Sequence, residues 1–98
     1  MLTLDLSLSN KALYNGCEIE EAAGRLNLKT PPAIATNIIG KNAQQIVNEN
    51  SGTEREVCLT GAMSIWAYLV VFHIVVHRFA KVWYDDGRGN KILVAAHG

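Results

Sequence analysis

An apolar segment from Gly61 to His77 limits the folds open to this chain. Its uncharged part, Ala62 to His77, would span about 24 Å as a helix, at a rise of about 1.5 Å per residue. A helix that crosses a bilayer needs about 20 apolar residues to cover about 30 Å of hydrocarbon. The segment is too short for a membrane span, and it contains two histidines. We therefore expect a buried helix.

The composition of the segment favours a strand, because six of its residues are β-branched. Its length favours a helix, since strands rarely exceed about ten residues. As a helix it also gathers one stripe of residues along a single side. That stripe comprises Trp66, Leu69, Val70, His73, His77 and Ala80.

The remaining patterns predict strands and a further helix. Alternating leucines predict a half-buried strand over residues 1–8, and residues 55–61 predict a second strand that runs into a turn. Residues 17–28 carry Ile, Ala and Leu at helical spacing behind three glutamates, which predicts a helix. Residues 78–86 and 91–98 predict two strands joined by a glycine-containing loop, which together form a hairpin.

The segment 30–52 allows two interpretations. Two prolines end the helix expected before it. Ile46 and Val47 indicate a short helix, whereas Gly40 and a cluster of asparagines indicate a mobile loop. Residues 48–52 are polar and are typical of a linker or loop.

Length and composition predict one domain over residues 1–98. Apolar residues make up 49% of the chain and its formal net charge is zero, which is typical of a globular protein without a field that attracts DNA or a membrane surface. Cys17 and Cys58 form no paired motif, so we expect buried thiols and a cytoplasmic protein. The expected fold class is α/β (α+β), a sandwich with helices packed on one sheet.

His73 and His77 stand four residues apart, about one helical turn. That spacing can ligate one metal ion, or place one imidazole as an acid or base beside a supporting one. The alternative is structural: one histidine caps the helix and the other is packed. The sequence supplies no third ligand beside the pair.

Asp85, Asp86 and Arg88 follow a predicted strand, at the kind of position where ligands of open sheets gather. The alternative is a solvated hairpin tip. Residues 57–98 hold four Lys or Arg against two Asp, a local excess of two positive charges that permits an anionic ligand.

A strand-to-helix turn runs from Thr60 to Ser64, and its free amides could hold a phosphate. A simple helix cap at Ser64 explains the same residues. Trp66 and the neighbouring aromatic residues could stack on bases, although aromatic residues at such spacings are more often core.

The pattern from Leu59 to Gly98 resembles the small CRISPR-associated family of type III systems, the ring nucleases that degrade cyclic tetra-adenylate. That family has a strand ending in a Ser-Gly turn, an Ile-Trp pair, a helix ending in histidines, a Tyr-Asp-Pro-Arg motif and a valine-rich strand ending in histidine. The matching elements are Leu59-Thr60-Gly61, Ile65-Trp66, His73 with His77, Tyr84-Asp85, Arg88, and Ile92 to His97.

The resemblance implies a ferredoxin-like or CARF-related sandwich that binds and degrades cyclic oligoadenylate with Mn²⁺. It also implies a homodimer, with the ligand held between dimers. The roles that it implies are catalytic for His77, Asp85 and Arg88, metal-binding for His73 and Asp85, and ligand-binding for Thr60, Gly61, Ser64 and Trp66.

Two departures from the family pattern leave other functions open. Ala62 and Ser64 stand where the family has Arg and Pro, and Arg88 is shifted by one residue relative to the Asp-Pro-Arg motif. One alternative is a module that binds the messenger without cutting it. Another is a small oligomerising domain with no nucleotide role, in which the apolar helix is a dimer face.

Overall fold

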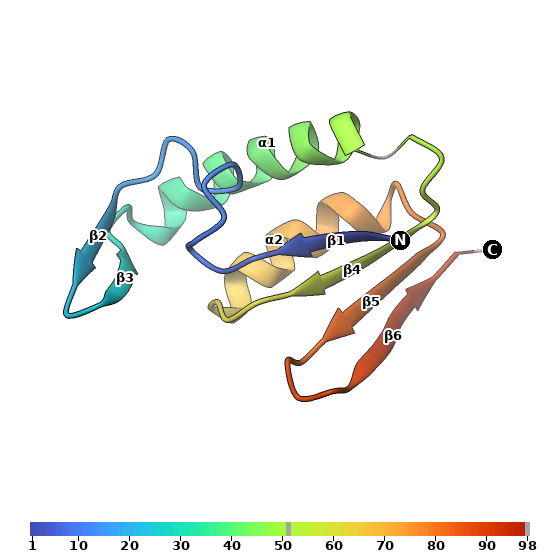
Figure 1. Ribbon diagram of the computed structural model, residues 1–98. Helices are drawn as coiled ribbons and strands as arrows, with labels where there is room; N and C mark the ends of the chain where they lie inside the picture. Colours follow the sequence, from blue (N-terminus) through green and yellow to red (C-terminus); the bar gives the residue numbers. More distant parts are fainter. Residues whose placement is uncertain (51, 98) are drawn as a thin grey trace.

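The computed structural model describes residues 1–50 and 52–97, and Figure 1 shows its strands and helices. In chain order they are β1 (Leu2–Asp5), β2 (Ile19–Ala22), β3 (Arg25–Leu28), α1 (Pro32–Asn50), β4 (Glu56–Thr60), α2 (Ile65–Val76), β5 (Lys81–Asp85) and β6 (Lys91–Ala96). The expected α+β class, with helices packed on one mixed sheet, is confirmed.

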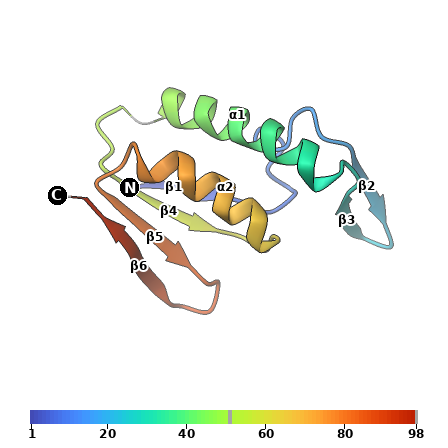
Figure 2. The same cartoon turned by 180° about the vertical axis from the view of Figure 1, so that it is seen from behind.

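The main sheet has the strand order β1-β4-β5-β6. The first three strands are parallel, and β6 returns antiparallel to β5. Parallel neighbours need crossover connections, which α1 and α2 supply. Because the strand order advances in one direction, both helices lie on the same face of the sheet, as Figures 1 and 2 show from opposite sides.

We distinguish two edges of this sheet. The carboxyl edge comprises the ends of β1, β4 and β5, next to the start of α2. The amino edge comprises the starts of β1, β4 and β5 and the end of β6, next to the end of α2.

The core lies between the helices and the sheet. Buried residues of α1 recur every four positions, and those of α2 do the same, so each helix presents a narrow apolar stripe. Gly40 on α1 faces α2, since a Cβ there would lie at ordinary contact distance, 3.7 Å, from Val70. The fully buried helix residues are Ala35, Ile39, Ala43 and Val47 of α1 and Ala67, Val71 and Val75 of α2.

The stripe of residues gathered along one side of α2 is not the side that the structure buries. Leu69 is 62% exposed and His73 is also exposed. The helix rests on the sheet and on α1 together, and the side that meets both carries Ala67, Val71 and Val75 instead.

The helix expected over residues 17–28 is also wrong. The segment forms the antiparallel hairpin β2–β3, which turns through Ala23 and Gly24 at φ values of +53° and +75°. Two consecutive positive φ values are typical of a tight hairpin turn. Within the hairpin, Ile19 and Leu28, which are paired across it, pack against the core.

The mobile-loop interpretation of the next segment is wrong, because α1 begins at Pro32 and continues through residues 48–50. Proline suits the first turn of a helix, where its missing N–H is not needed. Asn42 helps to hold the helix, since its side-chain amide donates to the carbonyl of Leu13 over 2.8 Å. Ser51, also expected in a loop, lies outside the described residues.

The expectations for the C-terminal half are confirmed, with strand, helix and hairpin in the predicted order. The first strand is shorter than expected and ends at Asp5, whose carboxylate accepts the amide of Ser7 over 2.8 Å as the chain turns. Within the described residues, every helix is too short or too polar to cross a membrane.

Candidate functional site

The residues expected in one site lie at two edges of the sheet. Thr60, Gly61 and Asp85 lie at the carboxyl edge, whereas His77 follows the other end of α2, at the amino edge. A helix of 12 residues is about 18 Å long. One protomer therefore does not bring Asp85 to His77.

At the carboxyl edge, Thr60 and Asp85 stabilise the sheet. The Thr60 hydroxyl donates to the backbone carbonyl of Asp85 over 3.2 Å, which joins the ends of β4 and β5. The carboxylate of Asp85 accepts the amide of Gly87 over 2.8 Å and so begins the hairpin loop. Both side chains are half-buried.

The loop that follows is organised by Asp86. Its carboxylate accepts the amide of Arg88 over 2.7 Å and the side-chain amide of Asn90 over 2.9 Å. The hydrogen bond from Asn90 is the main cause that lowers the pKa of Asp86 below its ordinary value. The Arg88 side chain is exposed at the tip, so the geometry matches the alternative of a solvated hairpin.

Gly61 is held in place by its neighbours. Its φ is +102°, and a Cβ at this position would lie 2.3 Å from Asp5 Oδ1 and 2.8 Å from the amide nitrogen of Ser7. The hydroxyl of Tyr68 donates to the carbonyl oxygen of Gly61 over 2.5 Å. The turn thus requires glycine for packing, whatever ligand it meets.

The residues expected to bind a ligand near this turn do not share a cavity. Gly61 lines a space of about 360 Å³ with Tyr68 and Tyr84, whose rings meet edge to face at 5.4 Å. Ser64 and Trp66 line another space, of about 320 Å³, between the start of α2 and the β2–β3 hairpin.

Ser64 occupies the N-cap position of α2, but its side chain makes no capping hydrogen bond. Its backbone carbonyl accepts the amide of Ala67 over 3.1 Å. Trp66 is half-buried and packs against the core. The expected side-chain cap is therefore absent, and the tryptophan contributes mainly to packing.

His73 and His77 lie together at the far end of α2, with ring centroids 5.1 Å apart and ring planes at 88°. Both side chains are exposed. Among the described residues, no group of three His, Cys, Asp or Glu side chains could hold a metal ion. The proposed pair of Mn²⁺ ligands, His73 and Asp85, does not fit one ion within one protomer, because Asp85 lies at the other edge.

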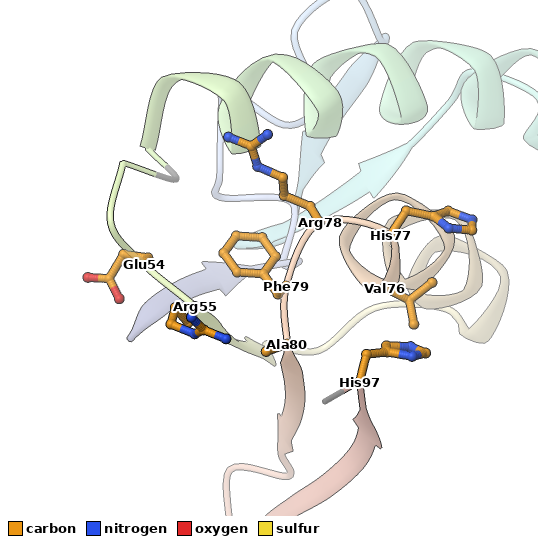
Figure 3. Close-up of a pocket in the computed structure, with 8 residues that line it drawn as sticks. All are labelled: Glu54, Arg55, Val76, His77, Arg78, Phe79, Ala80 and His97. Atoms are coloured by element: carbon orange, nitrogen blue, oxygen red, sulfur yellow. The ribbon is translucent and has the colours of Figure 1, made fainter.

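Next to His77, the structure forms a cavity of about 530 Å³ that the sequence did not predict, and we call it the amino-edge pocket (Figure 3). The rings of His77 and His97 extend in the same direction on either side of Val76, and the guanidinium of Arg55 points toward Ala80. The lining residues are Glu54, Arg55, Val76, His77, Arg78, Phe79, Ala80 and His97.

The acidic groups near this pocket already have partners. Glu54 pairs with the N-terminal ammonium group over 2.8 Å, and Figure 3 shows its carboxylate pointing away from the histidines. Glu56 accepts the indole N–H of Trp83 over 2.8 Å. Because the ammonium group offsets Glu54, Arg55 and Arg78 leave the pocket lining with an excess of positive charge, which favours an anionic ligand.

Sequence reasoning missed Arg55 as a site residue and gave His97 no role. Their proximity follows from the topology. The amide of Ala80 donates to the carbonyl of Arg55 over 2.8 Å, and the amide of His97 donates to the carbonyl of Ala80 over 2.6 Å. The predicted hairpin already implied that the end of the last strand returns to the start of the previous one. That signal could have placed His97 near His77.

Comparison with known proteins adds no relative: no protein-family model, curated protein or solved structure matches this chain.

Proposed function

We propose that this protein binds cyclic oligoadenylate at the amino-edge pocket and opens its ring by cleaving one phosphodiester bond. One observation carries the proposal: two imidazoles, His77 and His97, and one guanidinium, Arg55, line the same open cavity. Guanidinium groups bind phosphate well, and imidazoles exchange protons near neutral pH.

These groups match the chemistry of an RNA-type chain, in which each ribose carries a 2′-hydroxyl. One imidazole takes the proton of the 2′-hydroxyl, whose oxygen forms a bond to phosphorus. The bond from phosphorus to the 5′-oxygen breaks, and the other imidazole, as imidazolium, gives its proton to that oxygen. The product is one linear chain with a 2′,3′-cyclic phosphate at one end and a 5′-hydroxyl at the other, and Arg55 stabilises the charge on the transferring phosphate.

Asp85 and Arg88 enter this reaction only through a second copy of the chain, because they lie at the opposite edge of the sheet. The homodimer and the ligand-bridged assembly expected from the resemblance would supply that copy. The dependence on Mn²⁺ stays a prediction of the resemblance, since one protomer does not offer His73 and Asp85 to one ion.

The direct test is chromatography of cyclic tetra-adenylate after incubation with the purified protein, with Mn²⁺ and with a chelator. We expect linear products from the wild type, and a rate about 10²- to 10⁴-fold lower for His77→Ala, because removal of a general acid or base costs that much. Lys41→Ala is the control: its side chain is exposed on α1 and does not line the pocket. Equal rates for wild type and His77→Ala would refute the proposal.

A mixing experiment tests the contribution of the second copy. If Asp85 acts across protomers, His77→Ala and Asp85→Ala are each inactive alone, and a mixture of the two regains part of the activity. Full activity of Asp85→Ala alone would instead remove Asp85 from the reaction and leave the amino-edge pocket complete in one protomer.

A second candidate function is binding without cleavage. The separation of Asp85 and Arg88 from the histidines favours it, because a protomer then lacks the full set of residues that the resemblance implies. Intact ring that co-migrates with the wild-type protein, at the same level with His77→Ala, would identify this function.

A further inference from the structure

One hydrogen-bonded row crosses the amino edge of the sheet through Arg55, Ala80 and His97. Ala80 lies in the middle, with its amide bonded to the carbonyl of Arg55 and its carbonyl bonded to the amide of His97. The same three residues line two cavities, the amino-edge pocket of about 530 Å³ and a second space of about 300 Å³.

The two cavities share Arg55, Ala80 and His97 in their linings. Neighbouring strands lie about 4.8 Å apart, so the backbones of Arg55 and His97 stand about 10 Å apart with Ala80 between them. The amino-edge pocket includes residues that follow α2, on the helix side of the row, whereas the second cavity includes Glu56 and Lys81 at the starts of β4 and β5. We call the combined depression the edge groove.

The charge of the edge groove is predominantly positive. The linings of the two cavities hold Arg55, Arg78 and Lys81 together with the carboxylates of Glu54 and Glu56. Glu54 is offset by the N-terminal ammonium group, whereas Glu56, which accepts the indole N–H of Trp83, keeps its negative charge, so an excess of positive charge remains. A positive groove that runs over the edge of a sheet suits an extended anion better than a single small one.

We propose that the edge groove binds consecutive phosphates of a single-stranded oligonucleotide. The first phosphate lies between His77 and His97, and the next lies at Arg55 and Lys81. Trp83 belongs to neither cavity lining, and its indole N–H is held by Glu56, so the proposal rests on the basic residues. Positively charged grooves that follow the backbone are typical of single-strand binding.

This inference rests on the proposed function, because it assigns a second phosphate position to the same substrate. It adds that a mononucleotide fills only part of the site. It also identifies Lys81 and Ala80 as determinants of ligand length.

The test is a titration of full-length protein with labelled linear tetra-adenylate and with adenosine monophosphate, from about 50 to 200 mM salt. For Lys81→Ala we expect affinity for tetra-adenylate to fall about 3- to 10-fold, with the slope of log affinity against log salt reduced by about 0.7, as for one lost phosphate contact on a single strand. Affinity for adenosine monophosphate should change much less. Lys41→Ala, an exposed lysine on α1, is the matched control.

Ala80→Leu fills the space between the two cavities and should weaken binding of tetra-adenylate more than that of the monophosphate. Its circular dichroism spectrum and unfolding midpoint verify that it folds. Unchanged affinity and salt slope for Lys81→Ala would overturn the edge groove while the cleavage assay with His77→Ala still decides the proposed function. Three other results would overturn the edge groove. They are equal losses of affinity for both ligands, tighter binding of an acidic peptide than of tetra-adenylate, and no nucleotide binding by the wild type.

Discussion

The two edges of the sheet use their polar groups in different ways. At the carboxyl edge, Thr60, Asp85 and the carbonyl of Gly61 are joined to the protein by hydrogen bonds. At the amino edge, His77 and His97 are exposed around an open cavity. Ligands of open α/β sheets usually gather at the carboxyl ends of the strands. In this protein the polar groups of the carboxyl edge are occupied by contacts within the chain, and the anion site that we propose lies at the amino edge.

The comparison teaches how a motif can mislead. The carboxyl edge carries most of the residues that draw attention in the sequence, yet Thr60, Gly61 and Asp85 there have structural tasks. The amino edge assembles Arg55, His77 and His97 from three distant parts of the chain. Substitutions at the carboxyl edge should therefore lower stability, and those at the amino edge should change activity alone.

The largest effect on stability is expected for Gly61→Ala. The new methyl group would meet Asp5 and Ser7, and the backbone would keep a φ of +102° that alanine disfavours. We expect the free energy of unfolding to fall by about 2–3 kcal/mol, measured by urea denaturation. The control is Gly87→Ala, where φ is +76° but no atom lies within 4 Å of the added methyl group. Similar losses for the two variants would show that backbone strain, and not close packing, makes the turn rigid.

A smaller effect is expected for Tyr68→Phe, which removes the hydrogen bond to Gly61. We expect a loss of about 1 kcal/mol at neutral pH. Burial raises the pKa of Tyr68 to about 12 from an ordinary 10.0, so the folded state favours the neutral phenol. This contribution is complete below pH 10.0 and is lost as the pH rises to about 12. Urea denaturation at pH values between these two should show a smaller difference in the free energy of unfolding between wild type and variant. A difference that stays constant would contradict a stabilising role for the neutral Tyr68 phenol.

The smallest effect on stability is expected at the amino edge. Arg55→Ala and His97→Ala alter exposed side chains, and each should change the free energy of unfolding by less than about 0.5 kcal/mol. The same variants are expected to reduce cleavage or binding of cyclic tetra-adenylate. A loss of stability comparable to that of Gly61→Ala would remove the distinction between the two edges.

The sequence predicted the C-terminal half well because long patterns determine it. The apolar segment is too long for a strand, and two β-rich segments around a glycine loop leave few choices except a hairpin. Near the N-terminus, Ile19, Ala22, Ala23 and Leu26 have helical spacing but form part of a hairpin. Two of the four residues with that spacing are alanines, which are exposed and contribute little to any core. The spacing was therefore a weak indication of a helix.

The amino-edge pocket could not be predicted from local patterns. Arg55 precedes one strand, His77 ends a helix and His97 follows another strand, so only the assembled sheet brings them together. The HxxxH spacing did indicate a polar end of α2. It could not reveal that the partner of His77 in the pocket is His97, since that depends on β6 pairing beside β5.

The packing around Gly61 also affects how relatives of this protein should be recognised. Any chain that makes this turn, with an aspartate and a backbone amide pressed against it, must keep glycine there for steric reasons alone. A glycine shared at this point is thus a marker of common architecture and carries no information about the bound molecule. A search for functional counterparts would do better to ask for the arginine and the two histidines that meet at the other edge.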